Sequence, residues 1–295
     1  MRIILVLSLA GLTGALPICA QSVAAATAPT SGRSVPIFHV TVIERTLKAV
    51  NYQHHAGPTR VDMRGTVLLG KAQGEVVVEV KSGYTELNAK FNHVEPPTQF
   101  GTEFLSYVVW AITPDGHAIN LGELIPDGSN KGKMRVTCPY STFGLLVTAE
   151  PYFSVPYPSD VVVMENAIRP DTIGRVEDIE AKAELLPRGQ YTLNIKPQDL
   201  PSARMKQDLG VSMPEYEAIL ALYEARNAVQ IARADGADQF APDTLAKAQQ
   251  YLNDAEAQYQ RKIDFDNVTT TAHHAVQAAS DARVIALRNK TARQP

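Results

Sequence analysis

Residues 75–91 read EVVVEVKSGYTELNAKF, and this stretch decides the fold. On either side of Ser82-Gly83 the chain alternates between apolar and polar side chains, and those two residues suit a tight two-residue turn. Because successive residues of a strand point to opposite faces, Val76, Val78 and Val80 should share one face of the first strand. Leu87, Ala89 and Phe91 should likewise share one face of the second. The stretch therefore predicts an antiparallel β-hairpin with one face in the core and one in water.

Strand patterns continue along the chain. Residues 106–112 (SYVVWAI) are apolar on both faces, as in a central strand that is covered on both sides. A TPDG turn follows at 113–116, and 117–124 should return as the partner strand. Further strands are predicted at 144–149, 161–164 and 190–195. Short strands without intervening helical patterns predict an antiparallel, Ig-like β-sandwich over residues 37–195.

A helical pattern begins after a proline-containing linker at 196–213. Apolar residues there recur at alternating spacings of three and four, which predicts three amphipathic helices. The seams are Ala218, Leu222, Ala225, Val229 and Ala232; Leu245, Ala248, Leu252, Ala255 and Tyr259; and Ala272, Ala275, Ala279, Ala282 and Ala286. The predicted fold class is therefore α+β in two domains, with an antiparallel three-helix bundle at 214–292 after the sandwich.

The first twenty residues have the features of a signal peptide. Arg2 precedes a short apolar stretch, and cleavage is expected after Ala20, with residues 24–26 as alternative sites. Cys19 would permit lipidation, but Ile18 occupies a position where lipoprotein signals carry a small residue. A flexible leader is predicted at 21–36. We expect an exported protein, located in the periplasm or outside the cell, or associated with the outer membrane.

Composition limits the function of the mature chain. Its 45% hydrophobic and 20% charged residues are ordinary for a globular protein, and the net charge of −3 gives no reason to expect nucleic acid as a partner. No later apolar run is long enough to span a membrane. Once Cys19 is removed, Cys138 is the remaining thiol, so no intramolecular disulfide can form. Cys138 is interpreted as filling space rather than acting as a nucleophile.

No catalytic motif occurs at a diagnostic spacing, so we predict a non-enzymatic protein with no catalytic, cofactor-binding or metal residues. Two alternatives stay open. A polysaccharide hydrolase could use Glu150, Asp160 and Glu165 on the rim of the sandwich. A carbohydrate-binding or adhesion module could instead use an exposed aromatic row, and the candidates for it are Tyr152, Phe153 and Tyr157.

The remaining polar candidates have structural interpretations. The adjacent pairs His54-His55 and His273-His274 are predicted at the surface, because neighbouring side chains diverge and do not chelate naturally. Residues 264–267 resemble part of a calcium loop but are interpreted as a turn and a helix N-cap. The last helix carries cations that complement the helix dipole or could contact an acidic envelope polymer, namely Arg283, Arg288, Lys290 and Arg293.

Residues 107–116 (YVVWAITPDG), followed by NLGEL at 120–124 and VTAEP at 147–151, resemble the extracytoplasmic β-sandwich of anti-sigma-K-type factors. The resemblance covers about a third of the chain. The sigma-binding domain and transmembrane helix of that family have no counterpart here, so the resemblance implies a fold and not a sigma-related function.

Residues 232–237 (ARADGA) and 240–248 (FAPDTLAKA), with LNDA at 252–255, resemble an Ala-rich helical domain of unknown function in bacterial envelope proteins. That domain often precedes an outer-membrane-protein-A-like peptidoglycan-binding domain, which has no counterpart in these residues. The resemblance implies an envelope protein. We expect an envelope protein or a cell-wall component as the partner of helices 214–292, or a second copy of the chain in a homo-oligomer.

Overall fold

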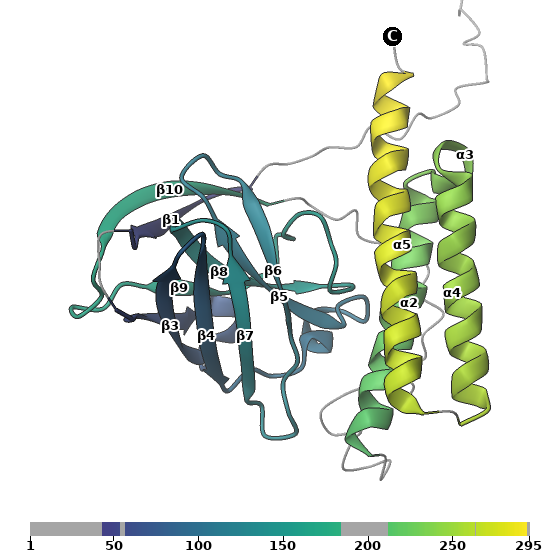
Figure 1. Ribbon diagram of the computed structural model, residues 1–295, viewed down its shortest axis with the longest axis horizontal. Helices are drawn as coiled ribbons and strands as arrows, with labels where there is room; N and C mark the ends of the chain where they lie inside the picture. Colours follow the sequence, from purple (N-terminus) through teal and green to yellow (C-terminus); the bar gives the residue numbers. More distant parts are fainter. Residues whose placement is uncertain (1–42, 54–56, 184–211, 263, 294–295) are drawn as a thin grey trace, which may run out of the picture. The chain divides into compact units, whose positions relative to one another are not determined.

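The computed structural model describes residues 43–53, 57–183, 212–262 and 264–293 (Figure 1). These residues form an α+β fold in which a large antiparallel sheet precedes four helices. The sheet and the helices belong to one compact unit, residues 39–295. The predicted signal peptide, leader and strand at 190–195 lie outside the described residues, as does all of the predicted linker except Ser212 and Met213.

Ten strands are described. They are β1 (Ile43–Asn51), β2 (Thr59–Gly65), β3 (Gln73–Lys81), β4 (Tyr84–Asn92), β5 (Ser106–Ile112), β6 (Ala118–Leu124), β7 (Gly132–Cys138), β8 (Thr142–Glu150), β9 (Val162–Ala167) and β10 (Arg175–Ala183). Short 3₁₀ helices, η1 (Val67–Leu69) and η2 (Pro97–Phe100), lie between strands. The helices are α2 (Met213–Ala234), α3 (Ala237–Phe240), α4 (Pro242–Gln260) and α5 (Phe265–Ala292).

The predicted hairpin is confirmed as β3 and β4. Lys81 pairs with Tyr84 across the turn, where Gly83 adopts a φ of 90°. Val76, Val78 and Phe91 are all buried, while their sequence neighbours are exposed or half-buried. This alternation places one face of the hairpin in the core, as the sequence pattern predicts.

Strand β5 is central, and every one of its residues is buried. It pairs antiparallel with β6 on one side and with β8 on the other. Its odd-numbered residues, such as Tyr107 and Val109, belong to the core inside the sheet. Val108 and Trp110 belong to a second core that also contains helix residues. Covering of both faces therefore explains why β5 is apolar throughout.

The sheet curls until its ends approach each other. Its strand order runs β10-β1-β8-β9-β2-β3-β4-β7, and β8 also pairs with β5, which carries β6. The backbone of Gly122 in β6 lies against the side chains of Met134 and Val136 in β7, and a Cβ atom there would touch both. The sheet thus nearly closes on itself. The predicted antiparallel β-domain is confirmed, whereas its Ig-like topology is not.

Four strands went unpredicted: β1, β2, β7 and β10. Their exposed faces carry many charged side chains, and in β2 only Thr59, Val61 and Met63 are buried. Strand β1 pairs with β10 along its whole length, although the two are more than 120 residues apart in the sequence. Such strands gain their stability from pairing with distant segments, so local apolar pattern alone gives little signal.

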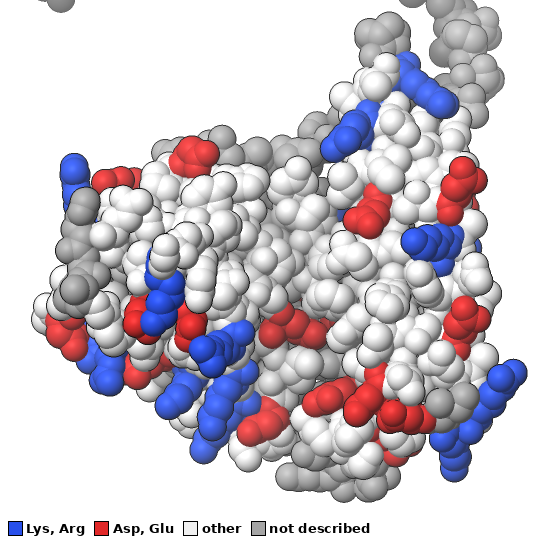
Figure 2. Space-filling model, viewed as in Figure 1, with Lys and Arg blue, Asp and Glu red and all other residues white. Residues whose placement is uncertain are grey.

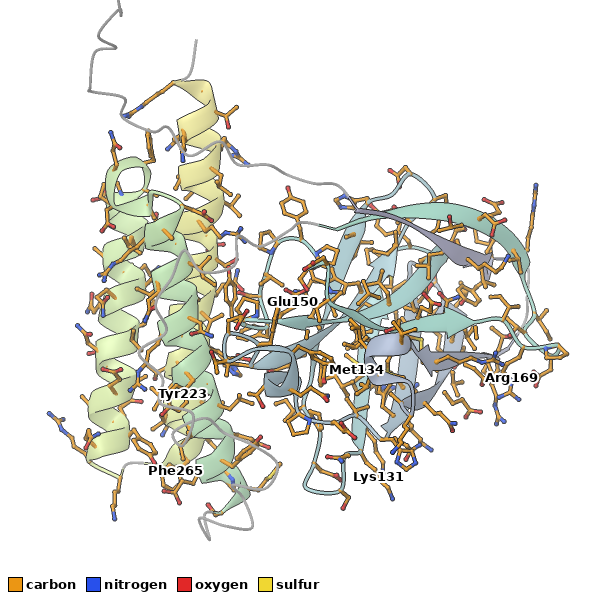
Figure 3. The ribbon with its side chains drawn as sticks, turned by 180° about the vertical axis from the view of Figure 1, so that it is seen from behind. Lys131, Met134, Glu150, Arg169, Tyr223 and Phe265 are labelled. Carbon is orange, nitrogen blue, oxygen red and sulfur yellow. The ribbon has the colours of Figure 1, made fainter. Side chains whose placement is uncertain are left out.

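The three predicted helical segments are confirmed as α2, α4 and α5, which run side by side in Figures 1 and 3. A short helix, α3, follows the left-handed Gly236 between α2 and α4, so four helices replace the expected three. Helix α2 begins at Met213, one residue inside the segment interpreted as linker, with Ser212 as its N-cap. The Ala-rich seams are buried throughout, except that Tyr259 is half-buried.

Candidate functional site

Three titratable side chains from three elements meet where the sheet contacts the helices. Glu123 belongs to β6, Glu224 to α2 and His273 to α5, and one ligand atom of each lies within 4.8 Å of the others. We call these residues the junction cluster. Among the described residues it is a group of His, Cys, Asp and Glu side chains that could hold a metal ion.

A β-bulge turns Glu123 toward this site. Trp110 pairs with Asn120 but the preceding Val109 pairs with Gly122, so β6 carries one extra residue, Leu121. A one-residue slip exchanges the two faces of a strand. Glu123 consequently lies opposite Val108, on the face that meets the helices, rather than inside the sheet. Gly122 supplies the φ of 127° that the bulge requires.

Helix α2 places Glu224 in an apolar stripe. Ala221 and Ala228 lie one turn before and after it, and both are buried. The Glu224 side chain is fully buried, and neither carboxyl oxygen has a hydrogen-bond donor in geometric range. A buried carboxylate without a partner is costly, so the residue needs a proton or a cation nearby.

Helix α5 presents its two adjacent histidines to different surroundings. His273 is half-buried, and its ring lies 4.7 Å from that of Phe153, tilted by 57°. His274 is exposed and its ring lies 5.5 Å from that of Tyr251. The prediction that the pair does not chelate as a unit fits this divergence. The prediction that both lie at the surface is wrong for His273, because α5 packs that face against the sheet's loop 151–159.

The pKa values of all three side chains in the junction cluster are shifted from their ordinary values. Burial raises the pKa of Glu224 well above its ordinary value, and the nearby charge of Glu123 raises it further, while the Ser106 hydroxyl and the backbone of Phe153 act in the opposite direction. Burial likewise raises the pKa of Glu123, against the opposing effect of contacts with Glu224 and with Ser106. Burial lowers the pKa of His273. All three groups are therefore driven toward their uncharged forms in the absence of a cation.

Neighbouring hydrogen bonds hold the cluster in place. The Ser106 hydroxyl donates to a Glu123 carboxyl oxygen at 2.8 Å. Asn227, one turn after Glu224, donates through Nδ2 to the carbonyls of Glu103 and Pro151, both at 3.2 Å. From α5, the Ser280 hydroxyl donates to the carbonyl of Ser154 at 2.7 Å. Both helices are thus fixed to the backbone of the sheet's loops.

A small crevice lies beside Glu123. It has a volume of ≈ 20 Å³, about the space of a single water molecule. Glu123, Leu105 and Leu220 line it, together with Tyr216 and prolines of the loops before β5 and after β6. Glu123 is the member of the junction cluster that lines this crevice, which has room for a water molecule or a small ion.

The three carboxylates expected on the sandwich rim have different surroundings. Glu150, labelled in Figure 3, is buried at the end of β8. Its Oε1 accepts hydrogen bonds from the Thr148 hydroxyl and from the backbone N–H of Ser159, the latter at 2.7 Å. Glu165 pairs with Leu146, four residues back along β8, which separates the two acids by about 13 Å along the strand. Asp160 is half-buried in the loop before β9.

This Glu150 arrangement is structural. The same Thr148 hydroxyl accepts the indole N–H of Trp110 at 2.8 Å, which links β5, β8 and the loop at Ser159. Glycosidases need a separation of roughly 5–10 Å between their carboxyl groups. The Glu150 carboxyl is fully buried and accepts the hydrogen bonds from Thr148 and Ser159, so it is not presented on the rim of the sheet.

The aromatic candidates form no exposed row. Tyr152 is fully buried, Phe153 packs against the core and His273, and only Tyr157 is exposed, at 58%. On the face shown in Figure 2, Lys and Arg side chains are interspersed with Asp and Glu. A carbohydrate-stacking platform is not built from these three residues.

The other histidines and the remaining polar candidates lie outside the junction cluster. His93 and His117 are exposed, while His54-His55 lie outside the described residues. Cys138 is buried at the end of β7, and burial raises the pKa of its thiol. Asp264 caps α5 by accepting from the N–H of Asp266 at 3.2 Å, as the N-cap interpretation predicts.

The cationic residues that were expected to act together on α5 have different environments. Arg283 is buried and pairs with Asp235, so it is not available as a surface cation. The guanidinium of Arg293 lies 5.4 Å from the centre of the Phe240 ring.

Comparisons with protein-family models, with curated proteins and with solved structures found no match. Within the described part of the chain, no helix combines the length and the apolar character needed to cross a bilayer.

Sequence reasoning missed the junction cluster, although two signals were available. A glutamate inside the apolar stripe of α2 is one, since charged residues are seldom fully buried without a partner. Gly122 within a strand pattern is the other, because an isolated strand glycine often marks a bulge. Neither signal identifies His273 as the third member, which depends on how α5 packs.

Proposed function

We propose that this chain is an exported, non-enzymatic protein of the bacterial envelope, in which the helices brace a binding sheet. The observation that carries the proposal is the core shared by the two parts. Val108, Trp110 and Leu146 of the sheet belong to the same apolar cluster as the Ala-rich seams of α2, α4 and α5. Such a continuous core favours a rigid supporting role for the helices.

The site of partner contact is proposed on the sheet rather than on helices 214–292. The Ala-rich seams of the helices are buried within the protein, so they are not available to a partner. Large hydrophobic side chains that are exposed in the described residues all belong to the sheet or its loops. They are Val67, Leu68, Tyr84, Tyr140, Tyr157, Ile173 and Val176. These side chains are the candidates that we propose for contact with another envelope protein.

The resemblances support the envelope location. An Ig-like sandwich of the anti-sigma-K type and a helical module of the envelope family are the finer assignments that we propose for the two parts. Burial of Glu150 and its hydrogen bond from the Ser159 N–H give the hydrolase alternative no support.

Export is tested with the full chain carrying a C-terminal tag in a Gram-negative host. We expect a processed protein beginning at Gln21 in the periplasmic or outer-membrane fraction. A charge in the apolar stretch, Leu7→Arg, should block processing, whereas the matched variant Cys19→Ser should be processed normally. Unprocessed wild-type protein in the cytoplasm would refute the proposal, and membrane release caused only by Cys19→Ser would show a lipid anchor instead.

Partner binding is tested by crosslinking in intact cells, followed by mass spectrometry. We expect crosslinks from the sheet to an envelope protein. Recovery of the mature protein solely as a free monomer would contradict the binding role.

A further inference from the structure

We propose that Glu123, Glu224 and His273 are ligands of a divalent transition-metal ion, with Zn²⁺ as the probe, and that this ion fastens the helices to the sheet. The inference goes beyond the proposed envelope function and does not depend on it. It rests on the donor atoms, on the burial of Glu224 and on the three elements that contribute ligands.

The donor set suits a borderline metal. Two carboxylates and one imidazole are common ligands of Zn²⁺, whereas an all-oxygen set would suit Mg²⁺ or Ca²⁺. The ligand atoms lie within 4.8 Å of one another. Binding would draw them to roughly 3 Å apart, as bond lengths of about 2.0–2.2 Å require, through small side-chain rotations. A fourth position remains for water.

Glu224 supplies the independent observation. Its side chain is fully buried at the centre of the cluster, and both carboxyl oxygens lack a hydrogen-bond donor. Two ionised carboxylates beside a neutral imidazole carry a charge of −2, which a divalent ion neutralises. Metal binding thus removes the cost of burying an unpaired carboxylate.

Surrounding groups complete the site. The Ser106 hydroxyl orients Glu123 by donating at 2.8 Å, and Phe153 packs against the ring of His273. Such outer partners fix ligand geometry in metal sites. Glu123 also lines a small crevice between the end of β6 and residues Tyr216 and Leu220 of α2. Since the ligands come from β6, α2 and α5, one ion would link the sheet to both helices.

The alternative occupant is a proton. Glu123 and Glu224 could share one, as close carboxyl pairs do, and His273 would then be neutral and uninvolved. Metal binding and proton sharing differ in how the protein responds to Zn²⁺ and to loss of His273, so the experiment can separate them.

The test uses the full chain as the cell processes it, purified without a metal-binding tag and stripped with chelator. Equilibrium dialysis against Zn²⁺, read by elemental analysis, should show one ion per chain, and Zn²⁺ should raise the melting temperature. Glu224→Gln and His273→Gln should each weaken binding by ~100-fold, and Ser106→Ala by ~10-fold. His274→Gln is the matched control, because it removes the exposed neighbour, and it should bind as the wild type does.

Co²⁺ substitution adds a spectroscopic readout. Its visible absorption bands should appear on binding and change in His273→Gln but not in His274→Gln. Millimolar Mg²⁺ or Ca²⁺ should not displace the ion. Circular dichroism of each variant verifies that it is folded.

Three results would overturn the proposal. One is a wild-type protein that binds no Zn²⁺. Another is binding that survives unchanged in Glu224→Gln and His273→Gln, which would place the ion elsewhere. The third is a rise in melting temperature caused by Glu224→Gln in a protein indifferent to Zn²⁺, which would assign the pair to a shared proton.

Discussion

Arg283 and Asp235 form an ion pair inside the helical part of the molecule. Arg283 Nε lies 2.5 Å from Asp235 Oδ2, and the two side chains are 2% and 7% exposed. Asp235 is the C-cap of α2 and Arg283 lies in the middle of α5, so the pair joins these two helices. Removing one member of a buried pair leaves the other charge in a medium that solvates it poorly.

We predict that Asp235→Ala lowers the free energy of unfolding by about 3–5 kcal/mol, because it strands the Arg283 guanidinium. Replacing both residues, as Asp235→Ala with Arg283→Met, should restore part of that loss. Urea unfolding followed by circular dichroism measures both.

The matched control is the half-exposed pair of Arg226 and Glu256, whose charged atoms are 2.7 Å apart. Glu256→Ala should cost less than about 1 kcal/mol, because solvent screens the pair. Equal losses in Asp235→Ala and Glu256→Ala would show that burial does not set the strength of the Arg283 pair.

At the scale of single residues, the sequence predicts burial and helix capping better than it predicts which side chains contact one another. The N-cap role of Asp264 and the buried seams follow from local rules and are confirmed. The partner of Arg283 lies 48 residues away, and the junction cluster joins residues separated by 150 positions. Contacts between residues so far apart in the sequence depend on how the elements pack, which no local pattern encodes.

At the scale of elements, the β3–β4 hairpin is the part that sequence determines most fully. Its register, its turn and its buried face all follow from alternation around Ser82-Gly83. Strands β1 and β10 show the opposite case, since their pairing joins the two ends of the sheet region. The central position of β5 could be predicted because a strand that is apolar on both faces must be buried on both faces.

We predict that Gly83→Ala lowers the free energy of unfolding by about 1–2 kcal/mol, because a Cβ atom disfavours the left-handed backbone there. Gly128→Ala is the control. Its Cβ would meet no atom within 4 Å and its φ is not positive, so its effect should stay within about 0.5 kcal/mol. Chemical denaturation of both variants tests this, and a cost at Gly128 as large as that at Gly83 would rule out the backbone explanation.

At the scale of the whole molecule, the sheet and the helices are expected to unfold together. They share one apolar cluster, and Asn227 bonds α2 to the carbonyls of Glu103 and Pro151. Far-UV circular dichroism reports mainly the helices. Fluorescence of Trp110, the single tryptophan, reports the sheet side of the core that the sheet shares with the helices. A common core should make the two signals change in one transition.

We predict that Asn227→Ala lowers the free energy of unfolding by about 1–3 kcal/mol, because two carbonyls lose their donor, and that both signals shift together. Asn253→Ala on the exposed face of α4 should change little. If the helix signal alone moved in Asn227→Ala, the two parts would be separate folding units.

The pairing of β1 with β10 also affects how the chain reaches this structure. Ile43 cannot meet Ala183 until both have been synthesised, and β2 must likewise wait for β9. Sheets dominated by such distant pairings fold in roughly milliseconds to seconds, because the entropy cost of closing long loops comes before the strand contacts can form. Until the sheet closes, these strands lack their partners. If the chain is exported as proposed, slow closure would leave time for it to cross the membrane before it folds.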